Sequence, residues 1–421
     1  MKKILIITPH YPPSNLAAVH RSRLFSLHLP TFGWEPIILV VDEKYYEEAL
    51  DWDLAALLPK NQRIEKVSAF PVTEPRLVGD IGLRAFFQLR KKALELVKSE
   101  NIDFVYIPIP SFYVSLIGPY LKRKTGVKYG IDYIDPWVHH FPGSEQFFSR
   151  HYFSTKLAKL LEPKAVRTAD IITGVAEGYY QGVIERNPYL RNQAQFGAMP
   201  YGGEKTDHEK LSKLKIKPYL FKKNEKFKFV YAGAMLPKAY SILEAIFQSM
   251  QQNKAFFTDI EFHFIGTGKL TNDPESFNIK SYAEKYGLWN TIVFEYPKRI
   301  PYLDVLVHLE QANAAFILGS TEPHYTPSKT YQAVLSEKPI FAVLHEASTA
   351  SQIVTDSNAG QCLTFKGEED VSLVKLEFTN KIKSFREFAS QYNAVQINQI
   401  LFEAYSAKSV TSKLVEFLNQ L

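Results

Sequence analysis

The sequence has few of the features that crosslink a chain or anchor it in a membrane. It contains one cysteine, Cys362, among 421 residues, which excludes an intrachain disulfide and a zinc site built from several cysteines. No apolar run approaches the roughly 18–20 residues that span a bilayer. The apolar run at residues 4–7 ends at Thr8-Pro9 and is shorter than the core of a secretion signal. These absences predict a cytoplasmic protein.

Two further signatures are missing. No G-x-G-x-x-G follows the first apolar run, which argues against a dinucleotide-dependent dehydrogenase. The net charge of +6 is compatible with anionic ligands or a membrane surface. The basic residues form no known nucleic-acid motif, so we expect no nucleic-acid partner.

What the sequence does contain is two successive series of short apolar runs that alternate with helical patterns. The expected strands lie at residues 4–8, 36–41, 104–108, 128–133 and 170–175, and then at 227–232, 261–266, 291–296, 314–318 and 339–344. The expected helices lie at residues 22–29, 83–98, 111–124, 241–252, 302–311, 328–335 and 347–355. Continuous apolar strands separated by helices are typical of parallel sheets covered on both faces.

This pattern predicts an α/β protein of two Rossmann-like, doubly wound domains, residues 1–203 and 204–392. The final segment, residues 393–421, is helical in pattern; it either returns across the hinge or covers the second sheet. Two similar α/β units of comparable size also predict a deep cleft between them, lined by the carboxyl ends of strands.

The most informative passage is the polar loop after the strand that ends at Leu318. Thr326-Pro327-Ser328 has a capping hydroxyl and a proline that are typical of a helix start. The free amides and the dipole of such a terminus favour an anion such as phosphate. Ser328 and Lys329 add a hydroxyl and a cation, and Gln332 lies one turn later, within reach of a ribose. The alternative is an ordinary capped surface helix.

Residues 327–332 (PSKTYQ) and 336–340 (SEKPI) resemble the donor-binding helix and following strand of the retaining glycosyltransferase family 4, which has the GT-B fold. The resemblance implies a nucleoside-diphosphate sugar as co-substrate, no other cofactor, no metal, and retention of the anomeric configuration. Family members usually carry two glutamates where this chain has His324 and Gln332. His324 would then lie at the sugar end of the site, and Glu322 is a carboxylate that can substitute.

The resemblance extends along the second domain. Gly233 ends the first strand and Lys238 follows it, where the family often places a basic pair against the diphosphate. Ala234 stands where many members have arginine, so Lys238 carries that role alone. Gly268 allows close approach of a nucleotide to the backbone, and Arg299 lies near the expected base or supplies a second diphosphate contact.

In the first domain, His10 and the helix containing Arg21 resemble the family's first loop, which contacts donor phosphate and acceptor. Asn15 lies where that loop normally holds a glycine pair. Asp135 follows a buried strand and either binds sugar hydroxyls or fixes the turn before Pro136. His139 is either a base toward an acceptor hydroxyl or a surface residue.

The sequence therefore predicts a metal-independent hexosyltransferase that moves a sugar from a nucleoside-diphosphate sugar to a hydroxyl acceptor, in surface polysaccharide or glycoconjugate assembly. The alternatives are a catalytically silent nucleotide-sugar-binding or scaffolding protein and a sugar-nucleotide epimerase of the same fold. The acceptor is a carbohydrate or is lipid-linked. Residues 83–98, with Phe86, Phe87 and Arg90, form either an ordinary amphipathic helix or a helix that lies on the inner face of an anionic membrane.

Overall fold

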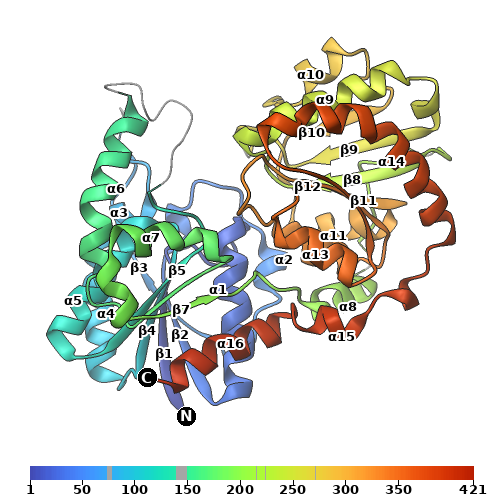
Figure 1. Cartoon of the computed structure of the whole chain (residues 1–421). Coiled ribbons are helices and arrows are strands. Elements are labelled where there is room, and N and C mark those ends of the chain that lie inside the picture. The colour runs from blue at the N-terminus through green and yellow to red at the C-terminus, as the bar shows by residue number, and fades with distance from the viewer. Residues whose placement is uncertain (74–77, 139–148, 215, 223, 271) are drawn as a thin grey trace. The chain divides into compact units, whose positions relative to one another are not determined.

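The chain divides into two compact units in the computed structural model (Figure 1). Unit 1 consists of Met1–Tyr201 and Ala407–Leu421, and unit 2 of Gly202–Ser406. The structure describes all residues except 74–77, 139–148, 215, 223 and 271. Among the described residues, none of the helices has both the length and the apolar character that crossing a membrane requires.

Unit 1 is built on a parallel sheet of seven strands in the order β3-β2-β1-β4-β5-β6-β7. The strands are β1 (Lys2–Ile7), β2 (Trp34–Val41), β3 (Arg63–Val67), β4 (Phe104–Ile109), β5 (Lys128–Tyr133), β6 (Ile171–Gly174) and β7 (Gln195–Ala198). The strand order reverses between β1 and β4. In doubly wound sheets, the carboxyl ends beside such a reversal are the usual place for a ligand.

Helices cover both faces of this sheet. The helices of unit 1 are α1 (Ala17–His28), α2 (Trp52–Ala55), α3 (Ile81–Arg84), α4 (Phe86–Ser99), α5 (Ile117–Thr125), α6 (Arg150–Val166), α7 (Gln181–Arg186) and α16 (Ala407–Asn419). Alternate residues of β1 point to opposite faces: Leu5 and Ile7 join the core beneath α4 and α5, while Ile4 and Ile6 join the core beneath α1 and α16.

The segment after residue 393 divides between the units. Helix α15 (Gln399–Glu403) lies in unit 2, while α16 packs on α1 in unit 1. Val410, Leu414 and Leu418 are buried in the same cluster as Ile4 and Ile6. The apolar pattern of α16 thus completes one face of the first sheet.

Unit 2 is built on a parallel sheet of six strands in the order β10-β9-β8-β11-β12-β13. The strands are β8 (Phe227–Ala232), β9 (Ile260–Ile265), β10 (Val293–Tyr296), β11 (Ala314–Leu318), β12 (Ile340–His345) and β13 (Gly360–Phe365). The helices are α8 (Lys205–Leu214), α9 (Tyr240–Gln252), α10 (Lys280–Lys285), α11 (Tyr302–Gln311), α12 (Lys329–Leu335), α13 (Thr349–Asp356), α14 (Val371–Gln391) and α15.

Aromatic side chains fill the core of unit 2. The rings of Phe229 and Phe262 stack at 4.6 Å between centroids, and Phe341 and Phe385 from β12 and α14 pack beside them. The strand order of unit 2 reverses between β8 and β11, as that of unit 1 does between β1 and β4. The predicted pair of Rossmann-like, parallel-sheet domains is confirmed.

The sequence pattern did not predict three of the described strands, and each of these lies at an edge of a sheet. β3 and β7 close the first sheet, and β13 closes the second. Their residues are mostly half-buried, as in the alternating polar sequence RIEKV of β3. These three edge strands are partly open to solvent, so their sequences lack the continuous apolar run by which the other strands were found, whereas β10, also at an edge, is mostly buried and was predicted.

Candidate functional site

In unit 2, glycine turns follow neighbouring strands at the carboxyl edge of the sheet. Gly233 follows β8 with a φ of +123° and Gly266 follows β9 with a φ of +71°. Both values are in the region that favours glycine. The amide of Gly233 donates to Ile265 O and that of Gly266 to Tyr296 O, each at 2.8 Å, so the turns lie side by side.

The other predicted residues of this edge lie beside those turns. A Cβ on Gly268 would come within 2.8 Å of Pro297 O, so this position is also restricted to glycine. A Cβ on Gly266 would lie 3.8 Å from the Cα of Arg299, which places the segment after β10 next to the turn after β9. The structure therefore brings Gly233, Gly268 and Arg299 to one edge.

Lys238 links the loop after β8 to the loop after β11. Its Nζ lies 3.4 Å from Glu322 Oε1, and its carbonyl accepts from the amide of Thr321 at 3.2 Å. Both charged side chains are partly exposed, at 41% for Lys238 and 29% for Glu322. Such a pair is weak in water, so Lys238 is free to exchange Glu322 for a stronger anion.

Three hydrogen bonds join the loop after β11 to the start of α13 and to Glu368, which follows β13. Thr326 Oγ1 and Thr349 Oγ1 are 2.7 Å apart, Ser348 Oγ donates to Tyr325 O at 2.7 Å, and Thr321 Oγ1 donates to Glu368 at 2.7 Å. The hydroxyl of Thr326 is buried in this arrangement. The loop is thus held in place before α12 begins.

The structure corrects the predicted start of α12. The helix begins at Lys329, and its N-cap residue is Ser328, which has helical angles and makes no capping hydrogen bond through its side chain. Thr326, the predicted capping hydroxyl, faces Thr349 instead. The sequence motif was interpreted as a standard cap, but the tertiary partner on α13 takes the hydroxyl.

Lys329 points into the protein. Its Nζ lies 3.5 Å from the centre of the Tyr231 ring on β8 and has no hydrogen-bond partner among the described residues. A Cβ on Gly233 would be 3.4 Å from this nitrogen, so the amine lies directly behind the glycine turn. Burial holds the pKa of Lys329 well below its usual value.

Gln332 and His324 are the two positions at which the sequence resemblance led us to expect acids, and the structure gives each of them polar or charged neighbours. Gln332 Oε1 lies 2.9 Å from His208 Nε2 on α8, and His208 Nδ1 lies 2.8 Å from Glu310 on α11. His208 was missed because it lies 124 residues from Gln332 in the sequence. Burial lowers the pKa of His324, although Glu322 nearby acts in the opposite direction.

In unit 1, the loop after β1 carries a hydrogen-bonded histidine and carboxylate. His10 Nδ1 lies 2.9 Å from Glu48 Oε1, and Ser14 Oγ donates to the same oxygen. The ring of His10 packs on Tyr46 at 4.9 Å. Burial alone would raise the pKa of Glu48, but the bonds from His10 and Ser14 lower it to about 2. Glu48 was missed, since no spacing in the sequence connects it to His10.

Arg21 is occupied inside unit 1. Its Nε and Nη2 donate to the two carboxylate oxygens of Asp132 at 2.7 and 3.0 Å, and both side chains are at most 1% exposed. Nη1 donates to Pro200 O, and Thr173 Oγ1 donates to Asp132 at 2.7 Å. This geometry makes Arg21 a clamp between α1, β5 and Pro200 rather than an open phosphate ligand.

The remaining predicted residues of unit 1 are not gathered into one group. Asp135 is exposed just after β5. Asn15 is partly buried before α1. His139 lies outside the described residues. Within the described part of the chain, no three His, Cys, Asp or Glu side chains are grouped to hold a metal ion.

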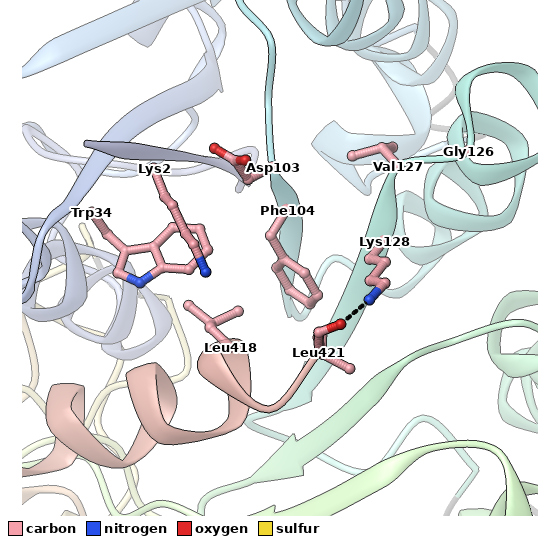
Figure 2. Close-up of a pocket in the computed structure, with 9 residues that line it drawn as sticks. All are labelled: Lys2, Trp34, Asp103, Phe104, Gly126, Val127, Lys128, Leu418 and Leu421. Atoms are coloured by element: carbon pink, nitrogen blue, oxygen red, sulfur yellow. Dashed lines mark hydrogen bonds between the residues drawn. The ribbon is translucent and has the colours of Figure 1, made fainter.

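A pocket of about 300 Å³ lies at the opposite edge of the first sheet (Figure 2). Lys2, Trp34, Phe104 and Lys128, which line it, stand at or next to the amino ends of β1, β2, β4 and β5. Lys128 donates to the carbonyl of Leu421, and the ammonium of Lys2 lies 5.2 Å from the Trp34 ring. Ligands of doubly wound sheets bind at carboxyl ends, so we do not assign the candidate site here.

Comparison with proteins of known structure identifies the fold of the chain. No family model matches the sequence, and no curated protein matches it. The chain is similar in structure to Anabaena HepE in complex with UDP and glucose, at 14% identity over 100% of both chains with a TM-score of 0.62. Sucrose-phosphate synthase from Thermosynechococcus elongatus shares 13% identity over 100% of this chain and 99% of that one, with a TM-score of 0.63.

A putative UDP-N-acetylglucosamine 2-epimerase from Listeria monocytogenes is more distant, with 11% identity over 99% of this chain and 95% of that one and a TM-score of 0.52. Likeness at such low identity is evidence about architecture. The chain therefore has the two-domain GT-B fold of these proteins, as the sequence predicted.

Proposed function

We propose that the chain is a glycosyltransferase that moves a sugar from a nucleoside-diphosphate sugar to a hydroxyl acceptor, in surface polysaccharide or glycoconjugate assembly. The proposal rests on the residues that lie together at the carboxyl edge of the second sheet. There, the turn at Gly233 lies against Lys329 and beside the turn at Gly266, and Lys238 follows Gly233 in the loop after β8. Backbone that a diphosphate can approach and cations that stabilise it are brought together at this edge.

The chemistry follows from the charge on the leaving group. Breaking the glycosidic bond leaves negative charge on the diphosphate and positive character on the sugar. Fixed cations and amides stabilise that charge most strongly where water is excluded. We assign this work to Lys238 and Lys329 and to the amides of the loop that ends at Ser328, with no bound metal. Activity that persists in excess EDTA supports this assignment, and complete loss of activity contradicts it.

UDP-glucose is the first donor to test, because structural neighbours are described in complex with UDP and UDP-glucose. A thermal-shift panel of UDP-, GDP-, ADP- and dTDP-sugars tests the donor site directly. We expect one nucleotide to raise the melting temperature, because a ligand that binds only the folded chain stabilises it. Stabilisation by none of them rejects the donor site. Retention, which the resemblance implies, is tested by NMR of the anomeric proton of the product.

His10 is the residue that we place against the acceptor. Its Nδ1 is held by Glu48, so its ring has a fixed orientation, and the side chain remains 24% exposed. Asp135, exposed after β5, is a second acceptor contact in this proposal. His324 is assigned to the sugar end of the donor site, with Glu322 beside it.

A catalytically silent nucleotide-sugar-binding protein is the second candidate. It is favoured by the bond between Gln332 and His208, since a residue expected to contact the ribose is already held inside unit 2. A sugar-nucleotide epimerase is the third, suggested by the Listeria neighbour. Donor binding without transfer or epimerisation supports the silent protein. Conversion of the donor to its epimer without acceptor supports the epimerase.

A lipid-linked acceptor at the inner face of an anionic membrane is the partner that we propose. Helices α4 and α6 both pack on α5 and expose Phe87, Phe153 and Leu160, with Lys156 and Lys159 exposed beside them. Phe153, Lys156 and Leu160 recur at helical spacing on one face of α6, and such a mixture of apolar and basic side chains suits an anionic bilayer. Sedimentation with phosphatidylglycerol but not phosphatidylcholine vesicles is expected, and F153S/L160S should abolish it.

The matched control for this surface is Leu376→Ser on α14. Leu376 is more exposed than Leu160, at 70% against 59%, but lies in unit 2. We expect this variant to sediment with phosphatidylglycerol vesicles as the wild type does. Equal loss in both variants, or no sedimentation of the wild type, rejects the membrane surface on α6.

A further inference from the structure

Lys329 is a buried amine that the local structure does not neutralise. Its Nζ has the Tyr231 ring on one side at 3.5 Å and no hydrogen-bond partner among the described residues. No ion pair joins it to a described carboxylate. A charged lysine in such a place loses its hydration and gains little in return. Burial accordingly lowers the pKa of Lys329 well below the usual value.

The position of this amine is nevertheless suited to an anion. The nitrogen lies directly behind Gly233, where a Cβ would be 3.4 Å away, and Gly233 has the left-handed backbone of an open turn. The next residue, Ala234, is exposed and carries no charge. Any side chain at position 233 would crowd the amine, so the glycine keeps open the path between Lys329 and the front of the turn.

The charged groups nearby are few. Tyr231 lies against the amine from β8; burial raises the pKa of Tyr231 well above its usual value, and Tyr325 and Tyr240 nearby raise it further. On the adjoining loops, Lys238 and Glu322 face each other at 3.4 Å. Glu368 accepts hydrogen bonds from Thr321 and Ser241. The charge of Lys238 is therefore partly balanced, while no acid balances a charge on Lys329.

We propose that Lys329 is the second cation of the donor diphosphate site, and that its amine takes up one proton from solvent when the donor binds. The amine becomes an ammonium, the diphosphate supplies the missing counter-charge, and the Tyr231 ring supports the cation from behind. The inference rests on the proposed function, because it assumes that a nucleoside diphosphate binds at this edge. It adds that donor affinity depends on pH through one buried group.

Isothermal titration calorimetry tests the proton directly. UDP, GDP, ADP and dTDP are titrated into the full chain at about pH 8, where the terminal phosphate of the nucleotide is already ionised since its pKa is near 6. The nucleotide that binds is then titrated in HEPES and in Tris, two buffers without phosphate whose enthalpies of ionisation differ. We expect the binding enthalpies in the two buffers to differ by about the difference between the buffers' ionisation enthalpies, because about one proton is taken from the buffer for each nucleotide bound.

Substitutions then assign the proton to Lys329. Lys329→Met should remove the buffer dependence and weaken nucleotide binding by roughly tenfold or more, the cost of a charge-assisted hydrogen bond. Its melting temperature without nucleotide should be unchanged or higher, because a buried apolar group replaces an unpaired amine. Lys381→Met, on the exposed face of α14, is the matched control and should behave as the wild type.

A second variant tests the geometry. In K329M, adding Ala234→Arg places a permanent cation in front of the same turn. We expect this double variant to recover most of the lost affinity without recovering the buffer dependence.

The outcomes separate the two proposals. If no nucleotide binds, the proposed function and this inference both fail. If a nucleotide binds with the same enthalpy in both buffers, or if K329M keeps wild-type affinity, the donor site remains and the inference about Lys329 is overturned.

Discussion

The side-chain oxygen of Gln332 on α12 lies 2.9 Å from Nε2 of His208 on α8, and His208 in turn contacts Glu310. This bond joins the helix that carries Lys329 to the first helix of unit 2. It gives Gln332 a structural role that competes with the ribose contact expected from the sequence. Substitutions of Gln332 and of His208 distinguish the structural role from the ribose contact.

Gln332→Ala and His208→Ala both break the bond, but only the first removes an amide that a ribose can use. We expect Gln332→Ala to lose about 1 kcal/mol of stability in chemical denaturation, since one buried hydrogen bond is lost, and His208→Ala to lose more, since its contact with Glu310 is lost as well. If Gln332 also contacts the donor, UDP binding falls further in Gln332→Ala than in His208→Ala. Equal affinities in the two variants show that the bond to His208 is its whole function.

The Arg21–Asp132 pair should be essential to the fold of unit 1. Asp132→Asn leaves the Arg21 guanidinium buried without its counter-charge, so we expect a loss of about 3–5 kcal/mol in the free energy of unfolding. Chemical denaturation measures it. The matched control is Lys44→Met, which breaks the exposed pair with Asp42 and should cost less than about 1 kcal/mol. Similar losses in both variants would contradict the assignment of Arg21 as an internal clamp.

Glu48 should act through His10. In Glu48→Gln, Nδ1 of His10 loses its charged partner, and the ring is no longer held toward one orientation. We expect kcat/KM for the acceptor to fall about tenfold, or roughly 1.4 kcal/mol, while UDP affinity is unchanged. Steady-state kinetics with varied acceptor measure it. The control is Glu43→Gln, which breaks a surface pair with Lys66. An unchanged kcat/KM in Glu48→Gln would remove His10 from the acceptor site.

The stability of unit 2 should fall in mild acid because His308 is buried as the neutral ring. Its Nδ1 lies 2.7 Å from Asp304 O, and its Nε2 accepts from the amides of Tyr219 and Leu220, each at 3.2 Å. An imidazolium cannot accept these bonds, and burial lowers the pKa of His308. Below pH ~6.5 His308 is therefore protonated in the unfolded chain, whereas in the folded chain it stays neutral down to a lower pH.

Because the unfolded state binds this proton more readily, the folded state becomes less stable as the pH falls. The contribution of His308 is complete above pH ~6.5 and is lost as the pH falls below this value toward the lower folded pKa. We expect the free energy of unfolding, measured by urea denaturation, to be lower at pH ~5.5 than at ~7.5, by on the order of 1 kcal/mol for His308. His308→Gln should shrink this difference. A residual dependence is expected from His263, whose pKa burial lowers to about 4. The same dependence in both proteins would contradict the proposal.

The sequence by itself determined the architecture. Central strands such as β1 and β11 are buried on both faces, so their residues must be apolar without interruption, and that run is visible in the primary sequence. The helix over residues 302–311 was found at the observed bounds of α11, because its buried positions recur with helical spacing. The glycines at 233 and 266 were also visible at the ends of such runs.

Only the tertiary structure decided what the polar side chains do. Arg21 and Asp132 lie 111 residues apart, His10 and Glu48 lie 38 apart, and Gln332 and His208 lie 124 apart. Polar side chains pair with whichever donors and acceptors lie near them in the folded chain. The sequence pattern does not indicate which residues far apart in the chain will form these pairs. For the same reason, Lys329 looks like a surface cation in the sequence. In the fold, its amine is buried on the Tyr231 ring of β8, with no ion pair to an acid among the described residues.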